Sequence, residues 1–430
     1  MYDLRSPLSR RDVLRTATLA GLAALFPARA FGADVVARAL AAGKILVMLE
    51  LEGGNDGLNT IVPYADTNYQ SARSTIRLRT DSTDDRYRVI PFTDFSGATA
   101  LPKPAGVGVH AALNDLMPAW QGGNLAIVQG LGYAQSNRSH FRGIDLWNHG
   151  VTDADPEQSN GWLGRMFTGQ DSTTIVDGIA LRRAGNNAAT MTGVNVLAMD
   201  NASDYLARTS SWTAPTVDQF TAAAANPALL HLLNTRKLAV EARGQLNAAV
   251  GTPPAFGVTW STSDIGRQLR TVAESIAGGM PCPFYKVSTG SFDTHADQPY
   301  RHRKLWVDVS LALKNFRDAM IEKSKWNNVL VVTYSEFGRR IAQNNSDGTD
   351  HGTAAPHLLL GGSVIGGIHG TQPSLTAVDE RNDMIATTDF RRYLATIGQF
   401  LGISATNRDA ALEPSATTPA GLYTPLAVLA

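Results

Sequence analysis

Cysteine is nearly absent from this chain: Cys282 provides the one thiol among 430 residues. A single cysteine excludes an intrachain disulfide, and it excludes a metal site built from several thiolates. An excess of either charge is absent as well, because 38 basic residues face 38 acidic ones. Without a basic excess the chain lacks the counterion release that drives nucleic-acid binding, so we expect no nucleic-acid partner.

Long hydrophobic runs are also missing. The run Ala17–Phe26 is too short to span a bilayer as a stable helix, and the sequence offers no other candidate. This run follows Arg10-Arg11 and precedes small residues, a pattern typical of a twin-arginine (Tat) export signal. We therefore expect residues 1–33 to be a signal peptide, the Tat translocase to be a partner, and the mature protein to be periplasmic or extracellular. The alternative is a chance arginine pair before a short helix.

Several catalytic and cofactor motifs are missing too. The chain has no HExxH zinc motif, no GxxxxGK[ST] phosphate loop, no CxxC pair and no evident GxSxG nucleophile elbow. Gly106 and Gly108 do not follow an expected strand, so a dinucleotide-binding fingerprint is unsupported.

Apolar runs of strand length alternate with helix-like segments over most of the chain. The expected strands are Lys44–Leu51, Leu125–Val128, Phe284–Val287, Val329–Val332, His357–Gly361 and Val364–Gly367; the expected helices are Leu113–Trp120, Ile265–Ile276, Leu305–Lys323 and Asp389–Leu401. Such alternation predicts an α/β fold with a largely parallel sheet. We expect one domain over residues 34–430, with a helical insertion at about residues 170–260.

Side chains of metal-binding type follow several of the apolar runs or lie shortly after them. They are Asp56, Asp293, His295, Glu336, Asp350 and His351. Sites in open α/β sheets assemble at the carboxyl ends of the strands, so we expect these side chains to share one cleft. Carboxylates and imidazoles are ligands of hard and borderline divalent ions. The sequence therefore predicts a site for one or two divalent ions, with Zn, Mn, Ca and Mg as candidates.

Other polar residues are candidates for catalysis or anion binding. Ser139 and His140 stand at an expected helix start, where free backbone N–H groups favour an anionic ester. Ser139 is therefore a candidate nucleophile, and His140 a candidate base or ligand. The candidate anion contacts are Asn55, Arg142 and Arg339, with Arg165 as a further possibility.

Each of these residues also has a simpler interpretation. Asp56 lies among glycines and suits an ordinary Asx turn. Ser139 suits an ordinary helix cap. Glu336 could pair with Arg339 for structural reasons alone, and the arginines could form surface salt bridges.

Longer segments resemble a known bacterial family. They include LELEGGNDGLNTIVPY, GNLAIVQGLGY, SNRSHF, GWLGR, FDTHADQ, TYSEFGRR and GTDHGTAAPHLLLGG. Together with the export signal, they resemble the family called domain of unknown function 1501, which is grouped with the alkaline phosphatase-like and sulfatase-like superfamily. The resemblance implies an alkaline phosphatase-like three-layer sandwich.

The resemblance also implies roles for single residues. Asp56 would hold one metal, Ser139 would be the nucleophile, and Asp293, His295 and His351 would hold the other metal. The chain departs from the superfamily pattern at Glu336-Phe337, where an Asp-His pair is usual, and at Asp293-x-His295, where the spacing is shorter. It also lacks the Cys/Ser-x-Pro-x-Arg segment of formylglycine sulfatases.

These observations lead to one principal hypothesis and two alternatives. The first is an exported metal-dependent hydrolase or transferase that acts on a phosphate or sulfate ester of a small molecule or polymer. The second, suggested by Phe337, is a catalytically degenerate metal- or polymer-binding envelope protein. The third is a redox protein exported with its cofactor.

Overall fold

A computed structural model describes Ala39 and residues 43–95, 104–134, 136–152, 160–167, 175–182, 189–191, 194–412 and 423–430. The expected export signal, residues 1–33, lies outside these residues. Among the helices that the structure describes, none has the length and apolar character needed to cross a membrane.

A nine-stranded sheet runs through the described part of the chain. Its main path, in spatial order, is β11 (Gly367–His369), β5 (Leu125–Gly132), β10 (Ala355–Gly361), β9 (Val329–Tyr334), β1 (Ile45–Leu51), β8 (Phe284–Thr289), β6 (Gly178–Leu181) and β7 (Val196–Met199), and β12 (Thr388–Asp389) pairs with β5. Only β10 pairs antiparallel with its neighbours among these described strands. The predicted α/β fold with a largely parallel sheet is therefore confirmed.

One strand prediction is wrong in its position. The expected strand Val364–Gly367 lies mostly before β11, which begins at Gly367. Val364 makes only an isolated bridge with Leu429, and Gly366 bonds to the loop carbonyl of Gly123. Val364 is therefore buried in the core without joining a strand ladder, and Ile365 is exposed.

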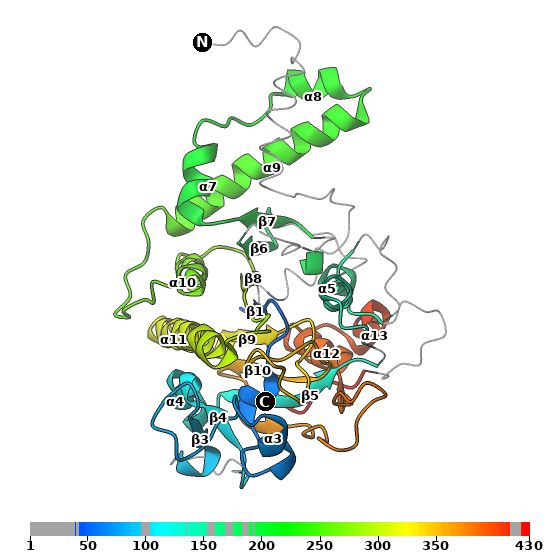
Figure 1. Cartoon of the computed structure of the whole chain (residues 1–430). Helices are drawn as coiled ribbons and strands as arrows, with labels where there is room; N and C mark the ends of the chain where they lie inside the picture. Colours follow the sequence, from blue (N-terminus) through cyan, green and yellow to red (C-terminus); the bar gives the residue numbers. More distant parts are fainter. Residues whose placement is uncertain are drawn as a thin grey trace.

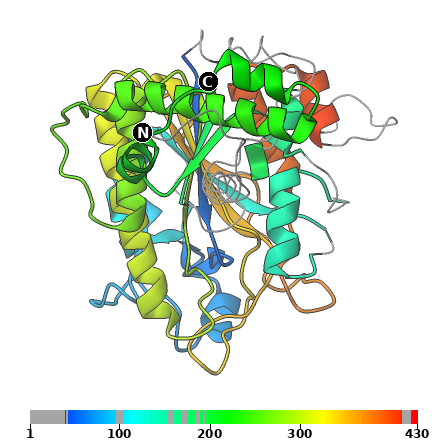
Figure 2. The same cartoon turned by 90° about the horizontal axis from the view of Figure 1, so that it is seen from above.

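Helices cover both faces of the sheet because β1 buries side chains on each face. Val47 and Leu49 belong to one core cluster, while Leu46 and Met48 belong to the other. The first face packs against α10 (Asp264–Ala277) and α11 (Gln298–Glu322); the second packs against α5 (His140–His149), α6 (Trp162–Met166), α12 (Phe390–Phe400) and α13 (Ala405–Leu412). Figures 1 and 2 show the resulting three layers.

Local signals explain why these helices form where they do. Ser263 caps α10 by accepting from the backbone N–H of Gly266, and Ile265, Leu269 and Val272 bury one helical face. The helix α11 begins seven residues before the expected Leu305, because its polar first turns carry no apolar period. The expected helix Leu113–Trp120 is divided between the 3-10 turn Ala111–Leu116 and α4 (Met117–Gln121).

The expected helical insertion contains α7 (Ala202–Thr209), α8 (Val217–Ala223) and α9 (Pro227–Val250). These helices lie beyond the β7 edge of the sheet, at the top of Figure 1. The same stretch of chain also supplies strands β6 and β7, which the sequence pattern did not reveal. At the opposite end lies a small sheet of β2 (Ile61–Val62), β4 (Gly108–His110) and β3 (Val89–Pro91), near α3 (Thr67–Ala72).

Buried histidines predict how the fold responds to acid. Burial lowers the pKa of His302 to about 4 and that of His357 to about 3. Because the unfolded chain takes up these protons near pH 6.5, stability is lost as the pH falls from about 6.5 toward 4. Between about pH 7 and pH 5, His302 alone accounts for about 2 kcal/mol of this loss. Urea unfolding of the His302→Gln variant should show a correspondingly smaller loss, and an unchanged loss would contradict this account.

Candidate metal centre

The ligand-type side chains meet at one edge of the central sheet. Asp293 and His295 follow β8, Glu336 follows β9, and His140 follows β5 after a short loop. These strands run in the same direction, so their carboxyl ends share an edge. His351 precedes β10, and its side chain reaches the same edge because β10 is antiparallel.

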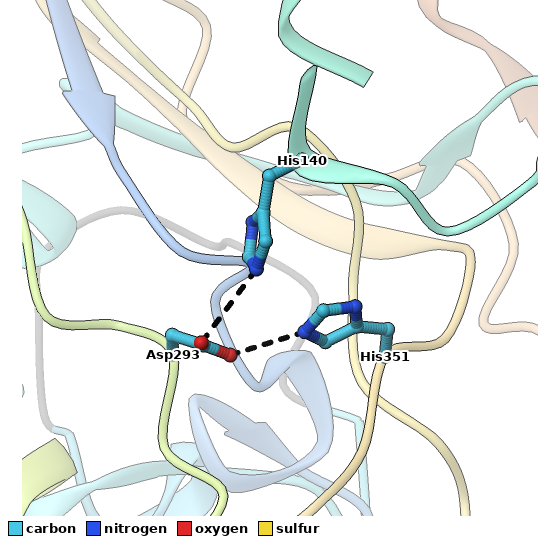
Figure 3. A group of neighbouring side chains, drawn as sticks. All are labelled: His140, Asp293 and His351. Atoms are coloured by element: carbon cyan, nitrogen blue, oxygen red, sulfur yellow. Dashed lines mark hydrogen bonds and ion pairs between the residues drawn. The ribbon is translucent and has the colours of Figure 1, made fainter. Parts of the chain in front are cut away.

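Three imidazoles surround the carboxylate of Asp293. The Nε2 atoms of His295 and His351 lie 3.0 Å and 3.1 Å from its Oδ1, and they lie 3.0 Å from each other. The Nε2 of His140 lies 3.6 Å from its Oδ2. Figure 3 shows His140 and His351 pointing at Asp293 from two sides. We call His140, Asp293, His295 and His351 the histidine cluster.

The second ring nitrogen of each histidine faces an oxygen acceptor. The Nδ1 of His140 lies 2.7 Å from Glu336 Oε1, that of His295 lies 2.9 Å from Asp350 Oδ1, and that of His351 lies 2.9 Å from the Arg138 carbonyl. Each acceptor favours the tautomer that carries its proton on Nδ1, and in the neutral ring this tautomer leaves the Nε2 lone pair for a metal. Three lone pairs and a carboxylate then converge, an arrangement that a cation stabilises.

The donor set fits a divalent metal ion. The ligand atoms of His140, Asp293 and His351 all lie within 4.8 Å of one another. Metal–nitrogen bonds of about 2.0–2.1 Å place tetrahedral ligands roughly 3.3 Å apart. The spacings around Asp293 are close to this value. Imidazole nitrogens with one carboxylate suit borderline ions such as Zn²⁺ better than Ca²⁺ or Mg²⁺, which prefer oxygen ligands.

The pKa values of the cluster residues shift in different directions. The hydrogen bond with Glu336 raises the pKa of His140 above its usual value, against the opposing effect of burial. Burial would raise the pKa of Asp293, but the Arg339 guanidinium outweighs it and holds this pKa below the usual range. Burial lowers the pKa of His351, which favours the neutral ring that a metal requires.

Arg339 supports the cluster from below. Its side chain is fully buried, and Nη2 donates to Asp293 Oδ1 at 2.5 Å. Its other N–H groups donate to the carbonyls of Gly53, Gly54 and Thr349. The guanidinium therefore fixes the Asp293 carboxylate. The contact of Arg339 with a substrate anion stays a prediction.

Two predicted metal ligands, Glu336 and Asp350, contact the Nδ1 atoms of the histidines and not the place where the Nε2 atoms converge. The carboxylate of Glu336 holds His140 and also accepts the backbone N–H of Gly53 at 2.8 Å. The carboxylate of Asp350 faces the Nδ1 of His295 at 2.9 Å. The structure thus places both carboxylates where they orient the imidazole rings of His140 and His295.

Asp56 and Asn55 are engaged within the protein interior. One oxygen of Asp56 accepts from the backbone N–H groups of Leu58 and Asn59, as in the turn that the sequence also allowed. The other oxygen pairs with Arg73 at 2.6 Å and accepts from Gln298. Asn55 is fully buried, and its side chain bonds to Thr60 and lies against His302. The proposed site therefore includes neither residue.

Ser139 stands at the start of α5, next to His140. It is half-buried, and its hydroxyl makes no capping hydrogen bond. Arg142 donates to the carbonyl of Thr152, and Arg165 donates to the carbonyls of Asn160 and Ala411. The roles of Ser139 as nucleophile and Arg142 as anion contact stay predictions.

Sequence reasoning missed Arg138 as a residue of the site, and it treated Phe337 only as a departure from the superfamily pattern. Arg138 adopts a left-handed φ of 61° and offers its carbonyl to His351. The ring of Phe337 packs against those of His140 and His351, with centroids 5.0 Å and 4.7 Å apart. The SNRSHF segment marked the region of Arg138, but no sequence signal reveals its backbone conformation.

Gly53 is predicted to be irreplaceable beside Asp293. Its φ is +119°, and an added Cβ would lie 2.3 Å from the backbone nitrogen of Asp293. We expect Gly53→Ala to destabilise the fold by more than about 2 kcal/mol. Gly244→Ala in α9 is the matched control: its Cβ meets nothing within 4 Å, and it should stabilise the helix by about 0.5–1 kcal/mol. Urea unfolding measures both, and equal effects would contradict the prediction.

The fold and the site define an α/β protein with a histidine–carboxylate centre. The family described as "Protein of unknown function (DUF1501)" matches residues 134–407, and the chain belongs to this family. No curated protein matches the chain.

Solved structures resemble the chain at low sequence identity. A protein in the alkaline phosphatase superfamily from Vibrio parahaemolyticus has a TM-score of 0.38 and 10% identity, covering 96% of this chain and 79% of that chain. The PsFucS1 sulfatase from Pseudoalteromonas sp. has 0.38 and 12%, covering 86% and 71%. The lipoteichoic acid synthase LtaP from Listeria monocytogenes has 0.34 and 10%, covering 91% and 78%. At such TM-scores, site residues are assigned from this chain's own geometry alone.

Proposed function

We propose that this protein is an exported metal-dependent hydrolase or transferase that acts on a phosphate or sulfate ester. The observation that supports the proposal is the convergence of three imidazole Nε2 atoms on the Asp293 carboxylate. In this proposal His140, Asp293, His295 and His351 hold a divalent ion, with Zn²⁺ or Mn²⁺ favoured by the nitrogen-rich donor set. A bound ion would polarise an ester oxygen and offset its negative charge.

The remaining residues orient the site and supply the nucleophile. Glu336 and Asp350 hold the Nδ1 protons of His140 and His295, so the Nε2 atoms keep facing the ion. The Ser139 hydroxyl is the proposed nucleophile because it immediately precedes a ligand and is not used as a helix cap. Ser139 stands directly before the first turn of α5, and the free backbone N–H groups of a helix's first turn favour an anionic group.

An ester panel tests this function. Wild-type protein, loaded with Zn²⁺ or Mn²⁺, is assayed with 4-nitrophenyl phosphate, bis(4-nitrophenyl) phosphate and 4-nitrophenyl sulfate. We expect turnover of at least one ester and a loss of about a thousandfold or more in Ser139→Ala. Ser203→Ala in α7 is the control and should retain full turnover. Equal activity in Ser139→Ala would refute the nucleophile, and no turnover with bound metal would favour a binding role at the envelope.

A further inference from the structure

A cavity of about 330 Å³ opens beside the histidine cluster. His295, His351 and Asp350 line it on the side of the proposed ion. The rest of its lining consists of three arginines and a further carboxylate, namely Arg138, Arg340, Arg381 and Asp383. Every lining residue thus carries a charged or titratable side chain, which suits a charged group better than an apolar one.

A buried carboxylate fixes two of these arginines. Asp383 is 1% exposed, and it accepts from Arg138 Nε at 2.7 Å and from Arg340 Nε at 3.1 Å. Asp379 accepts from Arg138 Nη2 at 2.6 Å. Guanidinium groups held in this way are preorganised, so a ligand does not have to order them on binding.

Arg340 and Arg381 keep N–H donors available for a ligand, and Arg138 does not. The third guanidinium nitrogen of Arg138 donates to the carbonyl of Ser136, so all three of its nitrogens have partners within the protein. Arg340 Nη2 donates to the carbonyl of Arg381, while its Nη1 donates no hydrogen bond to any described residue. Arg381 is exposed, and its guanidinium makes no hydrogen bond with the part of the chain that the structure describes. Arginine N–H groups form strong charge-assisted hydrogen bonds with oxyanions.

We propose that this cavity binds a second anionic group of the substrate, beside the ester that reacts at the metal centre. This inference rests on the proposed function, and it narrows the substrate class to esters that carry an additional carboxylate, phosphate or sulfate. Arg340 and Arg381 are the specificity-determining residues, and Asp383 positions Arg340.

A pair of non-hydrolysable phosphonates tests the inference. Propylphosphonate carries one anionic group, and 3-phosphonopropionate has a carboxylate in place of its terminal methyl. Calorimetry on Zn²⁺-loaded wild-type protein should show 3-phosphonopropionate binding about fivefold more tightly, the size of one exposed charge-assisted pair. The advantage should shrink in Arg381→Gln and fall to about one in Arg340→Gln/Arg381→Gln. Arg208→Gln, an exposed arginine of α7, is the control and should keep the advantage.

The outcomes separate the inference from the function on which it rests. If both phosphonates bind equally to the wild type, or the advantage survives in Arg340→Gln/Arg381→Gln, the cavity is not an anion subsite and the proposed function stands. If neither phosphonate binds the metal-loaded wild type, the metal centre does not take oxyanions, which overturns the proposed function and this inference together. Arg381 lies on the surface, so we expect Arg381→Gln to leave the folded core unchanged and the binding result to report on the cavity alone.

Discussion

Replacing His351 with alanine is expected to weaken divalent-ion binding at least about a hundredfold, because it removes one of four converging ligands. The loss should also appear in stability, since an ion at a hundred times its Kd adds about 2.7 kcal/mol to the folded state. Titration of chelator-treated protein with Zn²⁺ measures the affinity, and thermal unfolding with and without Zn²⁺ measures the stabilisation.

His369→Ala is the matched control for this variant. His369 is half-buried on β11, and its Nε2 lies 2.9 Å from the carbonyl oxygen of Ile365. It should bind Zn²⁺ as the wild type does. Asp350→Asn should have an intermediate effect of about ten- to a hundredfold, because the residue orients His295 without being a ligand. If Zn²⁺ affinity is the same in His351→Ala and His369→Ala, the ligand assignment is wrong.

The second large effect is expected at the buried pair of Arg73 and Asp56. Both side chains are at most 1% exposed, and they lie 2.6 Å apart. Arg73→Met would leave the Asp56 carboxylate without its countercharge, and it would remove donors from the carbonyls of Arg340 and Ile341. We expect a loss of about 3–5 kcal/mol in unfolding free energy, measured by urea denaturation.

An exposed pair serves as the control for this prediction. Arg86 and Asp84 also lie 2.6 Å apart, but their side chains are 48% and 41% exposed. Arg86→Met should therefore lower the unfolding free energy far less than Arg73→Met does, because solvent screens an exposed pair. Similar losses in the two methionine variants would show that burial does not govern the contribution of these ion pairs to stability.

The Asp56→Asn variant should still bind the metal ion. This result would separate a structural role of Asp56 from the ligand role that the sequence allowed.

The residue pattern was sufficient to predict the central strands β1, β5, β8, β9 and β10 and the edge of the sheet at which the ligand-type side chains meet. Apolar runs that end in glycine or ligand-type residues indicate where β1, β8 and β9 stop, and parallel pairing then brings Asp293, His295 and Glu336 together. This part is local, because hydrophobic period and turn residues determine where a strand ends.

The partners within the site could not be predicted from local pattern. His140 and Glu336 are 196 residues apart in sequence, and their contact depends on how α5 packs beside β9. Likewise, Asp350 faces His295 because β10 runs antiparallel, which its apolar sequence does not reveal. Which carboxylate coordinates and which one orients is decided by tertiary packing, so the sequence assigned all of them as ligands.

The metal content of the protein, purified without chelators, tests the central claim most directly. Mass spectrometry should find about one equivalent of a divalent ion, Zn²⁺ or Mn²⁺ above all, in the wild type and in Asp56→Asn. Asp293→Ala, folded by circular dichroism, should contain none. A wild-type protein that is folded and metal-free, or an Asp293→Ala variant with full metal content, would contradict the proposed centre.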